Sequence, residues 1–295
     1  MTENCPACRS TEVALVRKVP DREYGVDFVA GYTSCATCQT VRQTPMPDGA
    51  ELAAFYPADY HAQTGGGLLN RVRQAMRLKR LAPLMEGHGA VLDYGCGNGA
   101  FLVHAADRAP GREYFGFEIA QSREILHLEG GITIVKGDVK DLMDILPPCR
   151  LITMNHVIEH LPDPGVTVSE LSARLVPGGS LEGQTPAAGS LEQRLFKGYW
   201  SGYHAPRHTV VFSQRGLRSF LERLGLCEIQ VGGAFNPAGV AVSLAAARHG
   251  QSGSSVRREG PAWMLWLGLA TILMPGDLVI GPPGIQNFLA RKPSE

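Results

Sequence analysis

The chain has 295 residues, 19% of them charged, and its 28 Lys and Arg balance its 28 Asp and Glu. This length exceeds the ~200–250 residues of one α/β domain and leaves room for only a small second module. A neutral chain without a basic stripe argues against nucleic-acid binding, and we expect no nucleic-acid partner. The first residues do not resemble a signal peptide. Seven Cys without one indicate a cytoplasmic chain that uses Cys for metal binding rather than disulfides.

The N-terminal segment carries two Cys-x-x-Cys pairs with 26 residues between them. Each pair presents two thiolates from one tight turn, and two such turns complete a tetrahedral zinc site. Residues 12–19 and 26–32 have the pattern of a β-hairpin. Residues 1–46 are therefore predicted to form a small zinc ribbon whose closed site serves folding; free thiols or a redox pair are the alternatives. The predicted zinc ligands are Cys5, Cys8, Cys35 and Cys38.

A linker and a lead-in helix follow the ribbon over residues 47–84. The linker is rich in aromatic residues and is broken by the Gly-rich residues 64–67. A helix over residues 68–84 then leads into the first strand of the main domain. That domain is predicted to cover residues 85–295.

The most informative stretch is Val-Leu-Asp-Tyr-Gly-Cys-Gly-Asn-Gly at residues 91–99. Two apolar residues lead to Asp93, and Gly then alternates with other residues. This pattern is typical of a buried strand, a tight loop and a helix from about Ala100. Glycines let the backbone approach a ligand at the carboxyl edge of a parallel sheet, where open α/β folds bind cofactors. The spacing G-x-G-x-G differs from the G-x-G-x-x-G of nicotinamide and flavin binders.

Further strand signals follow the loop in an ordered series. Glu118 ends a short apolar run about 20 residues after the loop, where a doubly wound nucleotide site places the acid that binds ribose hydroxyls. Asp138 follows the next run, and Asn155 follows the one after it. The series predicts a doubly wound, mostly parallel, seven-stranded α/β sheet. After the first strand, the predicted strands lie at residues 114–117, 132–135, 151–154, 180–185, 228–234 and 285–291, and the predicted helices at 166–175 and 214–224.

These motifs resemble those of a known family. VLDYGCGNG, with an acid before the first Gly, resembles motif I of the S-adenosylmethionine (SAM) dependent methyltransferases with a Rossmann-like fold. NHVIEHLPDP and LVPGGSLEGQTP resemble later motifs of the type 11 and type 23 groups. CPAC, CATCQTVRQTPMP and ELAAFYPADYHAQ resemble the zinc-binding leader and linker before type 23 domains, except that Gln39 stands where that family usually has Gly. The resemblance implies a Rossmann-like methyltransferase fold with SAM as cofactor.

The resemblance also implies which residues contact SAM. Glu118 would bind the ribose, and Asp138 would bind the adenine amino group. The aromatic linker would fold over the pocket, which makes Tyr56 and Tyr60 candidate lid residues; simple packing of these rings is the other interpretation. The full set of expected contacts is Asp93, Gly95, Cys96, Gly97, Glu118, Ile119, Asp138, Val139, Asn155 and Tyr60. Three lone thiols are expected to pack in the interior: Cys96, Cys149 and Cys227.

The acceptor-side insertion spans residues 188–212 and resembles the W…D-x-P-R-H stretch of type 23 enzymes, with His204 where an Asp is often found. A His near neutral pKa suits removal of a proton from an acceptor hydroxyl. His208 is the first candidate base, followed by His204 and His156. Arg207 could hold an anionic group of the substrate. The alternative is that Arg207 and His208 brace the loop against the sheet.

A divalent ion is a second interpretation of the same region. His156, Glu159 and His160 are spaced i, i+3 and i+4, which places them on one face of a helix predicted to start here. They could bind an ion that activates the acceptor oxygen, with His204 or His208 as a fourth ligand. In metal-free relatives the same residues cap the helix and line the SAM pocket, and both interpretations stay open.

Residues 247–284 form a hydrophobic insertion in the last hairpin of the predicted sheet. Residues 261–274 carry an apolar run of about 14 residues, shorter than the ~20 that span a bilayer as a helix. Trp263 and Trp266 at its start resemble interfacial anchors. We expect residues 261–280 to form a hydrophobic lid or a peripheral contact with the inner face of the membrane. A helix buried in a dimer or domain interface is the alternative.

The expected activity is SAM-dependent methyl transfer to a small or lipid-like acceptor, first at oxygen and then at carbon or nitrogen. One alternative is an RNA methyltransferase whose zinc ribbon contacts RNA, against which the neutral charge argues. The other is a SAM-binding partner protein without catalysis.

Overall fold

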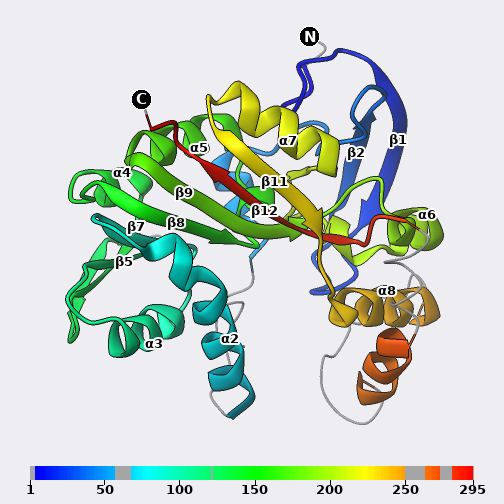
Figure 1. Cartoon of the computed structure of the whole chain (residues 1–295). Coiled ribbons are helices and arrows are strands. Elements are labelled where there is room, and N and C mark those ends of the chain that lie inside the picture. Colours follow the sequence, from blue (N-terminus) through cyan, green and yellow to red (C-terminus); the bar gives the residue numbers. More distant parts are fainter. Residues whose placement is uncertain (1–3, 57–67, 121, 250–262, 273–280, 295) are drawn as a thin grey trace.

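The computed structural model describes residues 4–56, 68–120, 122–249, 263–272 and 281–294, which form two sheets (Figure 1). The small sheet is antiparallel, in the order β1-β2-β3-β10. The large sheet has the order β11-β12-β9-β8-β4-β5-β7-β6. The small-sheet strands are β1 (Val13–Pro20), β2 (Val29–Cys35), β3 (Val41–Gln43) and β10 (Val210–Val211). The large-sheet strands are β4 (Ala90–Tyr94), β5 (Tyr114–Ile119), β6 (Glu124–Leu128), β7 (Ile132–Gly137), β8 (Cys149–Asn155), β9 (Leu175–Pro186), β11 (Cys227–Gly233) and β12 (Ile285–Arg291).

The large sheet confirms the predicted α/β architecture. Strands β7, β5, β4, β8 and β9 are parallel, and β12 runs antiparallel between β9 and β11. The chain passes from β4 to β5 on one side and later to β8 on the other, so a topological switch point lies beside β4, where such folds bind ligands. All seven predicted strands are present, and β6, antiparallel to β7, is an eighth. The sequence did not indicate β6 because its buried and exposed positions do not alternate.

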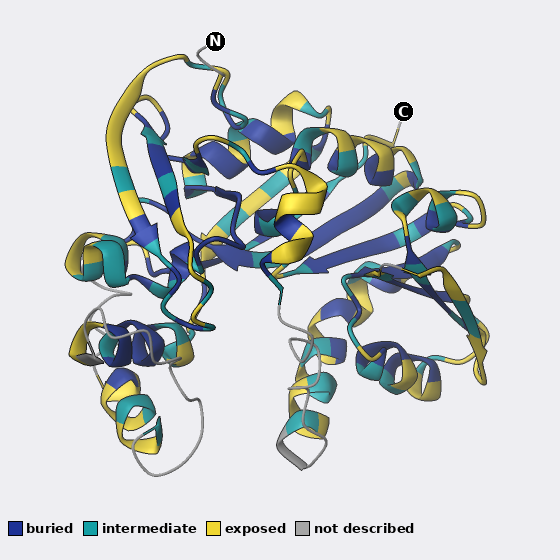
Figure 2. Cartoon of the chain, turned by 180° about the vertical axis from the view of Figure 1, so that it is seen from behind, coloured by how far each residue is buried: buried dark blue, intermediate teal, exposed yellow. Residues whose placement is uncertain are grey.

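Helices cover both faces of the large sheet (Figures 1 and 2), whose strands are largely buried. The helices of one face are α2 (Leu68–Met85) and α3 (Ala100–Arg108), and those of the other are α4 (Val139–Met143), α5 (Pro164–Ala173) and α7 (Gln214–Arg223). α5 begins two residues before its predicted start because Asp163 caps it and Pro164 suits the first turn. Further helices are α1 (Gly49–Ala54), α6 (Leu191–Phe196) and α8 (Pro237–His249), with single 3-10 turns η2 (Ile158–His160), η3 (Lys197–Tyr199) and η4 (Ser201–Tyr203).

The N-terminal segment is packed onto the main domain. β10, which belongs to the acceptor-side insertion, pairs with β3 and completes the small sheet. Cys5 and Cys38 belong to the same buried cluster as Phe220 of α7. The hydroxyl of Ser213, which caps α7, donates to the carbonyl of Cys38. The predicted ribbon, residues 1–46, therefore shares a core with the main domain.

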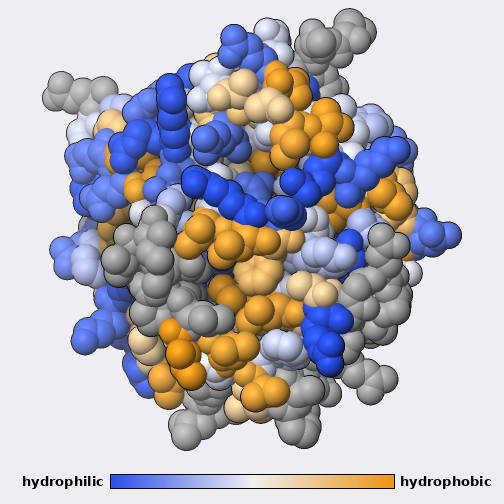
Figure 3. Space-filling view, turned by 90° about the vertical axis from the view of Figure 1, so that its right-hand side faces the viewer, coloured by the Kyte–Doolittle hydropathy of each residue, from blue (hydrophilic) through white to orange (hydrophobic). Residues whose placement is uncertain are grey.

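The chain between β11 and β12 contains α8, which precedes the hydrophobic insertion of residues 247–284 and overlaps it only at residues 247–249. Residues 263–272 are helical and pack on α8 through the half-buried rings of Trp263 and Trp266. The exposed side chains of this helix include Met264, Leu265 and Ile272. Figure 3 shows apolar patches on the face that carries β1, α6 and α8. No helix among the described residues is long and apolar enough to cross a membrane. The rest of the expected membrane segment, residues 273–280, lies outside the described residues, as do residues 250–262.

One buried ion pair joins the turn between β1 and β2 to the acceptor-side insertion. Arg207 donates to both carboxylate oxygens of Asp21, at 3.1 and 2.9 Å, and neither side chain has exposed surface. The other guanidinium bonds go to the carbonyls of Phe55 and Ala205 and to Nε2 of His204. All five N–H donors of Arg207 are thereby satisfied. Burial would raise the pKa of Asp21, but the bonds and charge of Arg207, together with backbone N–H donors, outweigh burial and lower it.

Removal of this arginine should destabilise the whole chain. Arg207→Met leaves Asp21 buried without its counter-charge, and breaking a buried pair in this way costs about 3–5 kcal/mol. We expect that loss in the free energy of unfolding from urea titrations. The double variant Arg207→Met/Asp21→Leu carries neither charge and should recover part of it. A loss below about 1 kcal/mol, as for an exposed pair, would contradict a structural role for Arg207.

Candidate functional site

The glycine loop between β4 and α3 has the backbone that its sequence predicts. Gly95, Gly97 and Gly99 have φ angles of 81°, 56° and 74°, in the left-handed region that glycine adopts without strain. A Cβ on Gly95 would lie 2.3 Å from Val157, and one on Gly99 would lie 2.6 Å from Ile134. A Cβ on Gly97 would meet nothing within 4 Å. The loop is therefore packed at its ends and open at Gly97, where a ligand can approach the backbone.

Glu118 and Ile119 lie beside this loop at the end of β5. Oε2 of Glu118 accepts a hydrogen bond from the backbone N of Gly97 at 2.7 Å, which places the carboxylate at the open side of the loop. Ile119 is 74% exposed although it is a large apolar residue. A carboxylate for ribose hydroxyls beside an apolar surface for a base is the combination that a nucleoside needs.

Two of the expected SAM contacts are engaged within the fold. The carboxylate of Asp93 is buried and accepts from Arg77 of α2 at 2.7 Å and from the hydroxyl of Thr153 at 2.6 Å. Asp93 therefore holds α2 against the sheet. Sγ of Cys96 packs on Gly116, where a Cβ would lie 2.7 Å from it, and burial raises the pKa of this thiol. The side chain of Cys96 is a packing group, as expected for the lone thiols.

The remaining expected contacts lie at the ends of β7 and β8. Asp138 is exposed and caps α4 by accepting from the backbone N of Lys140 at 2.9 Å, and Val139 behind it is half-buried. Nδ2 of Asn155 is buried and has no partner among the described residues. Tyr60 lies outside the described residues.

The groups at this edge fit SAM. Gly97, Glu118 and Asn155 follow or end three neighbouring strands at the switch point of the sheet. The open backbone, the carboxylate and the unpartnered amide are each groups that a nucleoside carrying an amino acid can use.

Histidines from two parts of the chain surround one acid. One part follows Asn155 directly, and the other is the acceptor-side insertion. The rings of His160 and His208 lie 4.5 Å apart, and those of His204 and His208 lie 5.0 Å apart. The acid is Glu159, which is fully buried. The cluster forms where η2 meets the acceptor-side insertion, because the backbone N and hydroxyl of Thr209 both donate to the carbonyl of Glu159.

His208 presents a free nitrogen to Glu159. Its Nδ1 bonds to the carbonyl of Gly202 at 2.8 Å, so Nδ1 carries the proton and Nε2 carries a lone pair. Nε2 lies 4.0 Å from Oε1 of Glu159. Burial, together with the charges of neighbouring histidines, keeps the pKa of His208 well below its usual value. Burial would raise the pKa of Glu159, but His156 and the other groups around the carboxylate together outweigh burial and lower it, so the acid is ionised.

Oε1 of Glu159 has a cationic neighbour in Nδ1 of His156, at 3.4 Å, but forms no hydrogen bond among the described residues. Oε2 accepts from the hydroxyl of Thr185 at 2.9 Å. A carboxylate oxygen facing an imidazole lone pair is stabilised by a proton, a water or a cation between them. Ligand atoms of Glu159, His160 and His208 all lie within 4.8 Å of one another, close enough to hold a divalent ion.

His156 stands apart from that group. It has a left-handed φ of 55° and precedes a single 3-10 turn rather than the predicted helix start. The helix cannot begin here because Pro162 disfavours the helical conformation in the residue before it. The ring of His156 is 44% exposed, bonds to Gln184 at 3.1 Å and lies 3.4 Å from Glu159. His208 therefore takes the place that the i, i+3, i+4 pattern gave to His156 among the candidate ion ligands.

His204 and Arg207 are both bonded within the fold. Nδ1 of His204 lies 2.8 Å from the carboxylate of Glu23, and its Nε2 accepts from Arg207. Both ring nitrogens of His204 are thus engaged, as are all donors of Arg207. This geometry favours the bracing interpretation for Arg207 and gives His204 a similar bracing contact, although the sequence offered that interpretation only for Arg207 and His208. It leaves His208 as the candidate base.

Tyr56 is a member of the cluster that the sequence indicates only as a candidate lid residue. Its hydroxyl lies 2.7 Å from Nδ1 of His160, which also lies 3.2 Å from the carbonyl of Arg207. Burial lowers the pKa of His160 to about 4. The segment that enters the linker therefore contributes directly to the histidine cluster.

The four predicted zinc ligands come together at one end of the small sheet. Their Sγ atoms all lie within 4.8 Å of one another. In two pairs the Sγ atoms are 3.6 Å apart, close to the roughly 3.8 Å edge of a tetrahedron with ~2.3 Å Zn–S bonds. After the Cys-x-x-Cys knuckles, Arg9 and Gln39 have matching left-handed φ angles of 65° and 66°. The close sulfur pairs are Cys5 with Cys38 and Cys8 with Cys35, and all four thiols are free.

Comparison with known protein families assigns the chain to one of them. A family model described as "Methyltransferase domain" matches residues 70–231, more than half of the chain. No curated protein matches significantly.

Several solved structures are similar at low identity. A SAM-dependent methyltransferase from Archaeoglobus fulgidus is 19% identical over 75% of this chain and 94% of its own, with a TM-score of 0.48. Phosphoethanolamine N-methyltransferase 2 of Haemonchus contortus is 15% identical over 83% of this chain and 57% of its own, with a TM-score of 0.48. The plantazolicin methyltransferase BamL is 13% identical over 85% of this chain and 92% of its own, with a TM-score of 0.46. These similarities do not identify the methyl acceptor.

The matched range contains the glycine loop, Glu118 and the acid of the histidine cluster. The chain belongs to the methyltransferase-domain family and is a SAM-dependent methyltransferase.

Proposed function

We propose that this enzyme methylates a hydroxyl oxygen of a small or lipid-like acceptor, with His208 as the general base. One observation carries the proposal: the hydrogen bond from Nδ1 of His208 to Gly202 leaves the Nε2 lone pair free, 4.0 Å from the ionised Oε1 of Glu159. SAM, when bound, supplies an electrophilic methyl group. The residues that would hold it are Gly97, through its open backbone, and Glu118, through its carboxylate.

His208 would take the proton of the acceptor. A hydroxyl becomes a good nucleophile only as its proton leaves, and a neutral imidazole can accept that proton. The hydrogen bond from Nδ1 to Gly202 fixes the ring so that Nε2 stays available. The carboxylate of Glu159, 4.0 Å away, would stabilise the imidazolium that forms.

The His208→Gln variant tests this role. Gln is neutral and cannot take a proton, so turnover should fall about 10²–10⁴-fold. Turnover is measured as S-adenosylhomocysteine formed with a panel of hydroxylated acceptors. SAM affinity in calorimetry should stay unchanged, whereas Glu118→Ala should weaken SAM binding by about 1–3 kcal/mol. Full turnover in His208→Gln would contradict the assignment.

The depressed pKa of His208 sets the expected pH profile. Protonation removes the base, so kcat/KM should fall only as the pH drops through the folded-state pKa, below about 6.5. Above that pH the rate should be level until another group titrates. His208→Gln should lose this acid limb. An acid limb above pH 7 that His208→Gln abolishes would assign His208 a raised pKa and overturn this account.

A divalent ion held by Glu159, His160 and His208 is the second candidate, favoured by the closeness of their ligand atoms. The two chemistries differ in their response to chelation. Loss of turnover in EDTA, restored by added Mg²⁺ or Mn²⁺, would support an ion that activates the acceptor oxygen. Turnover unaffected by EDTA would support His208 acting alone.

We also propose that the four N-terminal cysteines hold a structural zinc ion. The near-tetrahedral spacing of the sulfurs supports it. Purified protein should contain about one zinc per chain. Cys8→Ser should lose the ion and lower the melting temperature of the whole chain, because the cysteine cluster shares a core with α7. Cys227→Ser, at a lone half-buried thiol, is the matched control and should keep the ion. Metal-free protein with four alkylatable N-terminal thiols would exclude the site.

We propose that the helix at residues 263–272 brings the enzyme to lipid, in keeping with a lipid-like acceptor. Its exposed apolar side chains support this contact, although Trp263 and Trp266 face α8. The intact protein should float with phosphatidylglycerol-containing vesicles, and Leu265→Glu/Ile272→Glu should not. Leu128→Glu on β6, also at an exposed apolar residue, should float like the parent. No flotation of the parent protein would exclude the contact.

A further inference from the structure

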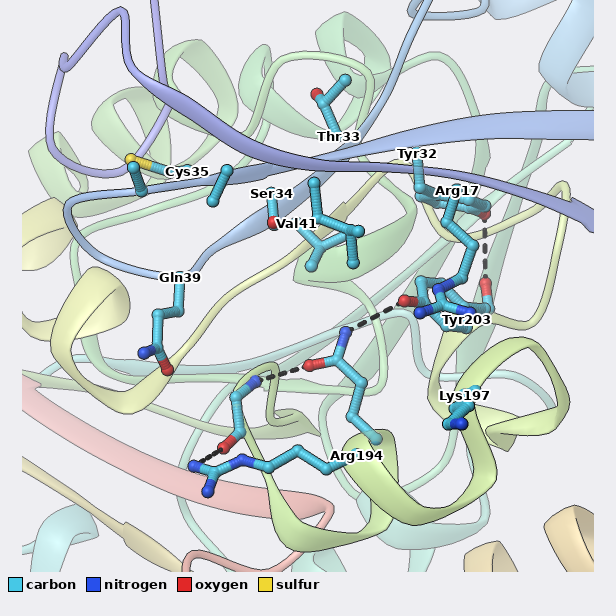
Figure 4. A pocket seen from close by; sticks show the side chains of 15 residues that line it. Arg17, Tyr32, Thr33, Ser34, Cys35, Gln39, Val41, Arg194, Lys197 and Tyr203 are labelled. Carbon is cyan, nitrogen blue, oxygen red and sulfur yellow. Dashed lines mark hydrogen bonds between the residues drawn. The ribbon is translucent and has the colours of Figure 1, made fainter.

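A pocket lies outside the site described above, between the small sheet and α6. Its volume is about 480 Å³, and Figure 4 shows it from close by. One wall comes from β1, β2 and β3, and the other comes from α6 and the turns that follow it. None of its lining residues belongs to the glycine loop, to the end of β5 or to the histidine cluster.

Three cations line this pocket without any acid to neutralise them. They are Arg17 on β1, Arg194 on α6 and Lys197 in η3 (Figure 4). No Asp or Glu is among the lining residues, and none of the three forms an ion pair within the described ranges. Nε of Arg17 is buried without a partner there, and Arg194 donates to the carbonyl of Gly189 at 3.0 Å. Unneutralised positive charge in a hollow attracts an anion.

Neutral polar groups of the pocket are held in fixed positions. Gln193 accepts from the backbone N of Gly189 at 2.7 Å and donates to the hydroxyl of Tyr203 at 3.1 Å, as the dashed lines in Figure 4 show. Oε1 of Gln39 lies only 2.5 Å from where a Cβ on Gly189 would be. The polar lining is therefore organised before any ligand arrives, which lowers the entropy cost of binding.

The rest of the lining is largely apolar. Leu15 and Val41 face the pocket together with the ring of Tyr32. The hydroxyl of Tyr32 donates to the carbonyl of His208 at 2.9 Å, so this wall also supports the backbone of the histidine cluster. A ligand that matches both kinds of surface needs an apolar body and an anionic group.

We propose that this pocket binds an amphipathic anion, a small molecule with a carboxylate or phosphate on an apolar body. The anionic group lies against Arg17 and Lys197, and Arg194 adds positive charge at the other end of the pocket. The apolar body lies against Leu15 and Val41. Because the lining shares no residue with the SAM site, both sites can be filled at once.

Calorimetry with hexyl phosphate tests the proposal in the full-length protein. We expect one saturable site per chain that binds hexyl phosphate more tightly than inorganic phosphate and does not bind the neutral hexyl glucoside. Arg17→Gln and Lys197→Gln should each weaken binding about 3–10-fold, as expected for a charge-assisted bond in a half-open site, and the more distant Arg194→Gln should weaken it less. The affinity should also fall with added salt.

Arg108→Gln, at an exposed arginine on α3, is the matched control and should bind hexyl phosphate like the parent. All variants should bind SAM with unchanged affinity, which separates loss of the pocket from loss of the fold. Equal binding of hexyl glucoside, undiminished binding in all three pocket variants, or competition between hexyl phosphate and SAM would overturn the proposal. Absence of saturable hexyl phosphate binding would do the same.

Discussion

The acceptor side of the molecule depends on the buried pair of Arg207 and Asp21. Burial of two charges is costly, and here it is offset by bidentate geometry, by three backbone N–H bonds to Asp21 and by carbonyls around the guanidinium. The pair holds the turn after β1, the residue after α1 and the acceptor-side insertion at one point. His208 follows Arg207 directly, so the position of the candidate base is set by a contact with the N-terminal segment.

The histidines of the cluster differ in pKa because their surroundings differ. Partial desolvation would lower the pKa of the half-exposed His156, but the adjacent Glu159 and Gln184 together outweigh it and raise the pKa. Burial lowers the pKa of His160 and of His208. Glu159 thus has a histidine that gains a proton readily on its exposed side and neutral rings on its buried side. Environments that push neighbouring pKa values apart are how one fold assigns acid and base roles.

The sequence predicts what depends on local pattern. The seven strands, the glycine loop and the two cysteine knuckles each follow from spacing within a short segment, and the structure has all of them. Roles that depend on a distant partner could not be predicted in this way. The sequence indicates Asp93 only as a cofactor contact, whereas the fold also brings Arg77 of α2 to it. It indicates His204 as a candidate base, whereas the fold engages its ring nitrogens with Glu23 and Arg207. The sequence did not predict β6, because an edge strand whose buried and exposed positions do not alternate has no periodic signal.

Gln39 shows how one departure from a family pattern can carry a second role. The position after a Cys-x-x-Cys knuckle needs a left-handed φ, which glycine adopts freely and other residues adopt at a cost of about 1–2 kcal/mol. A glycine there would have no side chain to reach Gly189, where only a residue without a Cβ leaves room for it. The strained backbone thus places a polar group in the wall of the cationic pocket. The cysteine knuckle that shapes the metal site therefore also shapes a surface where the small sheet meets α6.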